Sequence, residues 1–281
     1  VPLLEGNCGE PCSRPLFSLP INGHYRRANV VNELPEERLL DAVFKHLRTK
    51  RHRLLISSQV LIDSPVARVL PKVAKRYRFA ATIRPAPAAP IIDISGTWDD
   101  MLKNMPKRVR NELKRKRRRL ERTGDVQYRC IKAAEGLEPA IDDLFEIEAH
   151  SWKTLYGEAL SESENLRQFY TDLLYRCAAD RTLRLILVYL DNKPLAYLLG
   201  VVWKDEFDAL KTSFHNDYRN LSPGVTVVEQ SIRQACEEGL KVFDLFGGEV
   251  RWKRQLAISL REHVFCCFHS RYALRCHCCR T

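Results

Sequence analysis

The sequence predicts an α/β protein with a mixed, mostly antiparallel sheet flanked by helices. Stretches with helical periodicity alternate with short apolar, strand-like runs through most of its 281 residues. Three such runs follow one another between residues 183 and 214 with only short polar turns between them, as in an antiparallel meander. A proline-rich segment near residue 88 separates a smaller βα layer from the rest, so two domains are expected.

The first of these domains is assigned to residues 1–88. Residues 35–50 carry apolar side chains at helical spacing, and residues 54–56 are typical of a buried strand. A second helix is expected over residues 64–76, with Ser64 as its N-cap and Pro65 at its first position. Residues 84–90 contain three prolines and are predicted to be an extended connector.

The second domain is assigned to residues 89–281 and contains most of the predicted elements. Strands are expected at residues 91–94, 183–190, 195–203, 207–214 and 241–246. Helices are expected at residues 106–122, 140–152, 164–178 and 225–238.

Positive charge dominates the chain. Lys and Arg number 46 against 35 Asp and Glu, a formal net charge of +11, which favours a polyanionic partner. Much of this charge lies in the helix at residues 107–122, whose apolar stripe is limited to Val109, Leu113 and Leu120. Weak contact with a polyanion and a merely solvated face are both open interpretations of this helix.

Neither of the longest apolar runs, residues 183–190 and 194–203, approaches the roughly 20 apolar residues that a membrane span needs. The first residues lack the pattern of a secretory signal, so a cytoplasmic protein is expected. The chain begins with Val1 in place of Met, which suggests a fragment or a trimmed chain.

The 10 cysteines fall into two groups. Cys130, Cys177 and Cys236 are scattered singly through predicted strands and helices, which is typical of reduced core thiols. The tail is richer in Cys and His, but its single C-x-x-C motif, Cys276 to Cys279, is a weak zinc signal. A thiol-rich terminal strand is preferred there, and no metal is expected.

The most informative stretch runs from the end of a predicted strand, at Phe214, into a predicted helix. The junction reads Arg219-x-x-Ser222-Pro223-Gly224, and a helix N-terminus offers unpaired backbone N–H groups and the positive end of the helix dipole. An ordinary capped helix is the alternative. The residues expected to bind a phosphate-bearing cofactor here are Phe214, Arg219, Ser222, Pro223, Gly224, Val225 and Thr226.

This junction resembles the Arg/Gln-x-x-Gly-x-Gly/Ala pyrophosphate loop of the GNAT superfamily, with Ser222 in place of the first glycine. Residues 90–253 are similar, in the order and spacing of several short pieces, to the CelD-type family of cellulose-biosynthesis acetyltransferases, relatives of the Fem-type aminoacyl transferases. These pieces are residues 110–115, 120–124, 222–224 and 243–253. Residues 30–82 resemble that family's N-terminal half, a degenerate GNAT-like unit.

The resemblance implies an N-acyltransferase that moves an acyl group from acetyl-CoA or another acyl-CoA to an amine, in polysaccharide or cell-envelope biosynthesis. Two alternatives stay open. A Fem-type enzyme would take an aminoacyl group from a charged tRNA and hold the RNA on the basic helix at residues 107–122. A non-catalytic protein would keep the fold and bind polyanions only.

Acyl transfer to an amine needs a base, a proton for the leaving thiolate and a donor for the oxyanion. Glu249 is preferred as the base because it follows two glycines at a strand end, where loops carry chemistry. Asp244 could be catalytic or structural, and Glu148 is a third carboxylate to consider. Tyr218 is the expected acid, and the backbone at residues 210–214 is the expected oxyanion donor.

Two further residues are expected at the acceptor side of the site. Trp152 could form a wall of the acceptor pocket or simply belong to the core. Lys253 could hold a phosphate or an acidic acceptor, or serve solubility at the surface.

Overall fold

The structure is a computed structural model that describes residues 4–7, 15–18, 36–49, 54–247, 251–256 and 259–270. The chain divides into two compact units. Unit 1 comprises residues 1–89, 247–249 and 260–281, and unit 2 comprises residues 90–246 and 250–259. This differs from the expected single boundary near residue 88, because strand β10 (Ser259–Ser270) pairs antiparallel with β3 (Leu54–Leu61) and so joins the N-terminal unit.

Unit 1 packs two helices, α1 (Glu36–Thr49) and α2 (Pro65–Arg76), with strands in the order β1-β2-β3-β10-β4. The first two strands are β1 (Leu4–Asn7) and β2 (Pro15–Ser18). Ser64 caps α2 as expected, since its Oγ accepts a hydrogen bond from the Ala67 amide at 3.1 Å. Phe44 is fully buried at the centre of this core, with its ring 5.2 Å from that of Phe79 and 5.5 Å from that of Phe268.

The expected proline-rich connector is part of a strand. β4 runs without a break from Phe79 to Asp93 and includes residues 84–90. Proline lacks an N–H but its fixed φ is compatible with extended backbone, and residues two apart in a strand present their N–H groups to the same edge. Pro85 and Pro87 therefore remove donors from one edge of β4 only, and the strand survives.

Unit 2 is built on a sheet in the order β4-β9-β8-β7-β6-β5, in which only the last residues of β4 pair with β9 (Val242–Asp244). Its other strands are β5 (Val126–Ile131), β6 (Leu183–Leu190), β7 (Lys193–Trp203) and β8 (Glu206–Phe214). The expected meander of β6, β7 and β8 is confirmed. β9 runs parallel to β8 but pairs only with Glu206–Asp208, so the rest of β8, up to Phe214, continues beyond that pairing.

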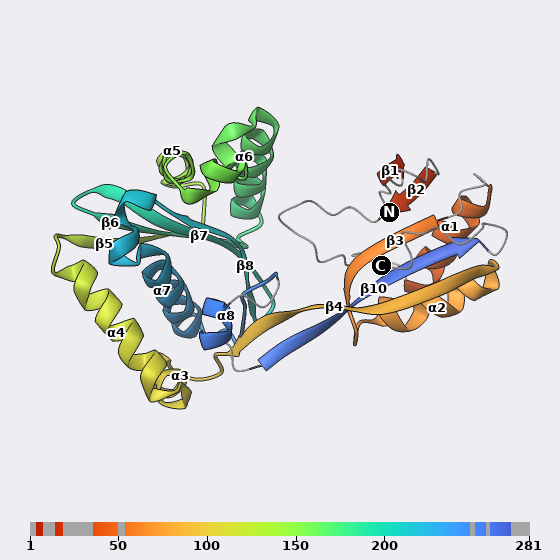
Figure 1. Cartoon of the computed structure of the whole chain (residues 1–281), viewed down its shortest axis with the longest axis horizontal. Coiled ribbons are helices and arrows are strands. Elements are labelled where there is room, and N and C mark those ends of the chain that lie inside the picture. The colour runs from red at the N-terminus through yellow and green to blue at the C-terminus, as the bar shows by residue number, and fades with distance from the viewer. Residues whose placement is uncertain are drawn as a thin grey trace. The chain divides into compact units, whose positions relative to one another are not determined.

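Helices cover both faces of this sheet. α5 (Leu137–Ala149) and α6 (Glu164–Ala179) lie on one face, and α7 (Pro223–Glu237) and α4 (Lys107–Glu121) lie on the other (Figure 1). The remaining helices are α3 (Trp98–Asn104) and α8 (Arg251–Leu256), and the short 3₁₀ helices are η1 (Trp152–Tyr156), η2 (Leu160–Glu162) and η3 (Asn216–Leu221). The predicted α/β fold, with a mostly antiparallel sheet flanked by helices, is confirmed.

The thiols predicted to be reduced and internal are free. Cys177 and Cys236 are buried and Cys130 is half-buried. The Cys276 to Cys279 motif lies outside the described residues, and within those residues no group of three or more His, Cys, Asp or Glu side chains is arranged to hold a metal ion. None of the described helices has the length and apolar character that crossing a membrane requires.

Candidate functional site

A cavity of about 330 Å³ lies in unit 2 where the end of β8 meets the start of α7. Both elements expose backbone here, because β8 has run past its partner β9 and α7 begins with a Gly224 amide that donates to no acceptor among the described residues. The volume falls within the range of small-molecule sites. The cavity is lined by Trp152, Thr212, Ser213, Phe214, Arg219, Ser222, Pro223, Gly224, Val225, Val228 and Trp252.

The start of α7 is shaped by Ser222, which has the left-handed φ of 59° and occupies the N-cap position without making a side-chain capping bond. The Val225 and Thr226 amides donate to the Ser222 carbonyl, at 3.0 and 3.3 Å. Within the described part of the chain the Gly224 amide donates to no acceptor. The Ser222 hydroxyl and the Gly224 amide are thus both available to a ligand at the positive end of the helix dipole.

Gly224 also has a packing role. A Cβ on this residue would lie only 2.9 Å from Cδ1 of Phe214, so a larger residue would force either the Phe214 ring or the start of α7 to shift. The sequence argument gave Gly224 a role in close approach to a ligand. The geometry assigns it a second one, bringing α7 against the end of β8.

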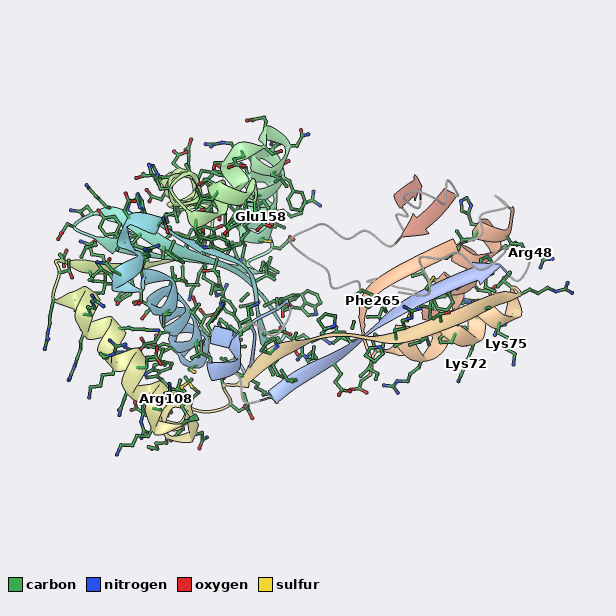
Figure 2. The ribbon with its side chains drawn as sticks, in the orientation of Figure 1. Arg48, Lys72, Lys75, Arg108, Glu158 and Phe265 are labelled. Atoms are coloured by element: carbon green, nitrogen blue, oxygen red, sulfur yellow. The ribbon has the colours of Figure 1, made fainter. Side chains whose placement is uncertain are left out.

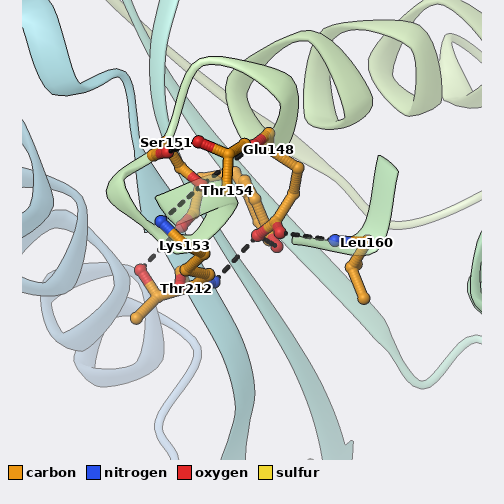
Figure 3. Close-up of polar contacts among 7 residues, drawn as sticks. Glu148, Ser151, Lys153, Thr154, Leu160 and Thr212 are labelled. Carbon is orange, nitrogen blue, oxygen red and sulfur yellow. Dashed lines mark hydrogen bonds and ion pairs between the residues drawn. The ribbon is translucent and has the colours of Figure 1, made fainter. Parts of the chain in front are cut away.

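A buried polar cluster lies behind the cavity, where η1 crosses β8 (Figure 3). Glu148 is fully buried, and its Oε1 accepts hydrogen bonds from Lys153 Nζ at 2.8 Å and from the Tyr197 hydroxyl at 2.6 Å. Its Oε2 accepts from the Leu160 amide at 2.9 Å. Lys153 Nζ also donates to the Thr212 carbonyl, at 2.8 Å.

The pKa values in this cluster follow from burial and close charges. Burial alone raises the pKa of Glu148, but the charges of Lys153 and Lys211 and the hydrogen bonds from Lys153 and Tyr197 outweigh it and lower that pKa overall. Glu148 is therefore an ionised, fully engaged carboxylate, poorly suited to act as a base. Burial, together with the charge of Lys153, lowers the pKa of Lys211 to about 8.

The structure brings most of the residues expected to bind a phosphate-bearing cofactor to this one cavity. Thr226 is the exception, since it is buried one step further along α7. Trp152 lines the cavity as well, but as the first residue of η1 and 40% exposed, so it lies outside the core. The expected residues in the lining are Trp152, Phe214, Arg219, Ser222, Pro223, Gly224 and Val225.

The three expected catalytic residues are placed differently. Asp244 is fully buried at the end of β9, and its Oδ1 accepts from the Phe246 amide at 2.8 Å, as a structural carboxylate does. Tyr218 is half-buried in η3, with its ring 5.2 Å from that of His215. Glu249 lies outside the described residues.

Lys253, expected either to hold an anion or to serve solubility, is half-buried and bonded to backbone carbonyls of unit 2. Its Nζ donates to the carbonyl of Leu245, at 2.9 Å, and to that of Phe246. Burial lowers the pKa of Lys253 to about 8, against the opposing charge of Asp244. It therefore ties α8 to the turn after β9, next to Trp252 in the cavity wall.

Four residues at or behind the cavity were not singled out by the sequence argument: Ser213, Trp252, Lys153 and Lys211. Lys211 is a charged residue within a predicted strand, directly after Ala209 and Leu210. A charge in that position could have marked it as a candidate site residue. Lys153 follows Glu148 by five residues across a helix end, a spacing that no periodicity highlights. Ser213 and Trp252 become notable only once β8, α7 and α8 are brought together.

The sequence was compared with models of protein families. The model of the GNAT acetyltransferase domain matches residues 107–254, a little more than half of the chain. The chain belongs to the GNAT acetyltransferase family. The match spans α4 through most of α8 and so contains every residue that lines the cavity.

Solved structures share the fold of this GNAT protein at low sequence identity. L-PGS from Bacillus licheniformis has a TM-score of 0.60 at 9% identity, covering 97% of this chain and 82% of that one. A conserved protein of unknown function from Bacteroides thetaiotaomicron has a TM-score of 0.59 at 14% identity, with coverages of 94% and 82%. FemX has a TM-score of 0.57 at 14% identity, with coverages of 94% and 83%. No curated protein sequence matches.

Family membership establishes the class of reaction. This GNAT protein is an acyltransferase, and the cavity that its domain forms at the start of α7 is its candidate active site.

Proposed function

We propose that this protein is an N-acyltransferase that takes an acyl group, most simply acetyl, from acyl-CoA and passes it to an amine. The observation that carries the proposal is the cavity at the start of α7. Its lining includes Gly224 with its unpaired amide, Ser222 with a hydroxyl that makes no capping bond, and Arg219 with its guanidinium. In the proposal, Gly224 N–H, Ser222 Oγ and Arg219 bind the pyrophosphate of coenzyme A. All three favour negative charge at the helix N-terminus.

The acyl-bearing arm lies, in this proposal, along the part of β8 that continues past β9. The amine nitrogen attacks the thioester carbonyl carbon, the oxyanion collapses, and the thiolate of coenzyme A leaves. Glu249 is the proposed base that takes the proton from the amine, and Tyr218 is the proposed acid that gives a proton to the thiolate. The proton on Glu249 then returns to Tyr218 through water, so both residues end in their starting states. The burial of Asp244 and the three hydrogen bonds to Glu148 support leaving both carboxylates out of proton transfer.

The finer assignment follows the CelD-type resemblance. We propose a cytoplasmic enzyme whose acceptor is an amine of polysaccharide or cell-envelope biosynthesis. Trp152 and Trp252 offer two aromatic walls to such an acceptor.

A second candidate concerns the donor. The exposed face of α4 carries Lys107, Arg108, Lys114, Arg115, Arg118, Arg119 and Arg122, and none of these side chains forms an ion pair with another described residue. Figure 2 shows the side chains of α4, Arg108 among them, projecting away from the sheet. Basic side chains without ion-pair partners favour the binding of a polyanion. An aminoacyl-tRNA is therefore the rival donor, which the Fem resemblance implies.

The test of the proposed function is direct product detection. The protein is incubated with acetyl-CoA, or with a charged tRNA, and a panel of amines, and N-acyl products are identified by mass spectrometry. Product from acetyl-CoA supports the proposal. Product from the charged tRNA alone would replace it with the Fem-type reaction, and failure to bind or use either donor would leave polyanion binding as the remaining function.

A further inference from the structure

Ser213 has an unexplained hydroxyl in the wall of the cavity. The side chain is 2% exposed, and its Oγ has no hydrogen-bond partner among the residues that the structure describes. Leaving a buried polar group unpaired costs about 1–3 kcal/mol, and the large majority of such groups in proteins are paired. An unpaired hydroxyl that faces a ligand cavity points to a polar atom supplied by the ligand.

Lys153 brings a second donor to the same place. An ammonium group has three N–H donors, and here two of them are taken, by Glu148 Oε1 and by the Thr212 carbonyl, both at 2.8 Å. The third has no acceptor within the described residues. Figure 3 shows Lys153 reaching Thr212. The Thr212 carbonyl belongs to the peptide that joins Thr212 to Ser213, so the ammonium lies beside that peptide group near the end of β8.

The Lys153 ammonium is held by a buried ion pair. Its Nζ lies 2.8 Å from Glu148 Oε1, and the charges of Glu148 and Glu158 both act on it. Lys153 is 12% exposed at its side chain and Glu148 is fully buried, so water screens the cluster poorly. Fixed donors of this kind stabilise negative charge that develops during a reaction.

We propose that the Ser213 hydroxyl and the Lys153 ammonium together bind the carbonyl oxygen of the acyl thioester and stabilise its oxyanion. The inference rests on the proposed acyl-CoA reaction. As the amine nitrogen bonds to the carbonyl carbon, the π pair of C=O moves onto oxygen, where both groups donate hydrogen bonds. The pair then returns, the C–S bond breaks, and neither Ser213 nor Lys153 gains or loses a proton. Glu148 is a positioning residue that holds Lys153.

The experiment reads the carbonyl directly and needs no acceptor. Isotope-edited infrared difference spectra of acetyl-CoA labelled at its carbonyl carbon give the C=O stretch of the bound thioester, which hydrogen bonds lower. Ser213→Ala removes one donor and Ser213→Thr keeps it. Lys153→Met alone would leave Glu148 buried without its cation, so Lys153→Met/Glu148→Gln is used to remove both members of the ion pair together. Ser231→Ala is the control, because Ser231 is also fully buried and bonds only the Val227 carbonyl within α7.

In the wild type, Ser213→Thr and Ser231→Ala, the C=O stretching frequency of bound acetyl-CoA should be lower than that of free acetyl-CoA. Ser213→Ala and the double variant should return it toward the value of free acetyl-CoA, with the Kd of unacylated CoA unchanged. With an active acceptor, kcat of Ser213→Ala should fall ~10²-fold. A wild type that binds CoA but has the same carbonyl stretch as Ser213→Ala would overturn this inference alone, whereas a wild type that does not bind CoA would overturn the proposed function beneath it.

Discussion

At the scale of the residue, Ser222 explains how this chain departs from the glycine of the superfamily's pyrophosphate loop. Its φ of 59° lies in the left-handed region that glycine adopts without strain and that costs other L-residues roughly 1–2 kcal/mol. The chain keeps the turn and gains a hydroxyl that makes no capping bond. Ser222 therefore adopts a backbone conformation that glycine favours.

Ser222→Gly tests this interpretation. Relief of strain should exceed or offset the entropy that glycine loses on folding, so the free energy of unfolding should stay equal or rise by up to about 1 kcal/mol. The Kd of CoA should rise about tenfold, because the variant loses the Ser222 hydroxyl that is proposed to bind the pyrophosphate, whereas the Gly224 amide is unaltered. Ser222→Val, which places a β-branched residue at the same φ, should destabilise. Equal stability of the valine and glycine variants in urea unfolding would refute the assigned backbone.

The pKa of Lys253 gives a prediction with a defined sign. Burial lowers it from 10.5 to about 8, so between these pH values the unfolded chain binds more protons than the folded one. Stability must then rise with pH through that window. The difference in unfolding free energy between wild type and Lys253→Met should increase from pH 8 to 10.

Lys241→Met is the matched control. Lys241 is exposed and bonded to Asp205, which raises its pKa above 10.5, so the same difference should stay flat over this range. Parallel pH profiles for the two lysine variants would show that Lys253 is not held as described.

At the scale of the element, α4 carries basic side chains both on the face that packs against α7 and on the face exposed to solvent. Arg117 bonds Glu229 of α7 at 2.7 Å, and Glu229 is only 6% exposed, with a pKa raised mainly by burial. Arg118, one residue on, is exposed and forms no ion pair with the other described residues. Arg117 therefore contributes to the packing of α4 on α7, whereas Arg118 contributes only charge at the surface.

Substitution of each arginine by Met should have different consequences. Arg117→Met leaves a buried carboxylate without its cation and should lower the free energy of unfolding by about 1–3 kcal/mol at pH 7. Arg118→Met should change it by less than about 0.5 kcal/mol. Chemical denaturation of the two variants measures this, and a larger loss for Arg118→Met would contradict the docking of α4 on α7.

The outward face of α4 should bind polyanions electrostatically. Retention of RNA on a filter should fall steeply as salt rises, and replacing Lys114, Arg115, Arg118 and Arg119 by Gln should remove most of it. Equal charge is removed in the control by replacing Lys45, Arg48, Lys72 and Lys75 of α1 and α2, three of which are labelled in Figure 2. If both quadruple variants lose retention equally, or neither does, α4 has no specific role.

The long periodic elements could be predicted from the sequence. α1, α2, α6, α7 and the meander appear where the periodicity placed them. Residues 84–90 of β4 were predicted to be a connector because each proline lacks an N–H donor. That prediction did not consider which edge of the strand each missing donor would face. β5, which pairs with β6 and forms the edge of the sheet, was missed, although Val126, Tyr128 and Cys130 alternate with polar residues in its sequence.

At the scale of the whole molecule, the least predictable feature was long-range pairing. β10 returns to β3 across about two hundred residues, and no local pattern encodes such a partner. The same limit applies to the site. The loop at Arg219 to Gly224 was readable because it is contiguous, whereas Ser213, Lys153 and Trp252 come from three separate elements that only the fold brings together.

The central claim is that the cavity at the start of α7 binds the pyrophosphate of an acyl-CoA, and calorimetric titration of CoA into the wild type and two arginine variants tests it most directly. The account predicts saturable heat for the wild type and for Arg233→Gln, whose exposed side chain pairs with Glu237 further along α7. Arg219→Gln should bind at least about tenfold more weakly, since a charged hydrogen bond to phosphate is worth about 1.5–3 kcal/mol. No heat with CoA, acetyl-CoA or longer acyl-CoAs, or equal affinity in all three proteins, would contradict the claim.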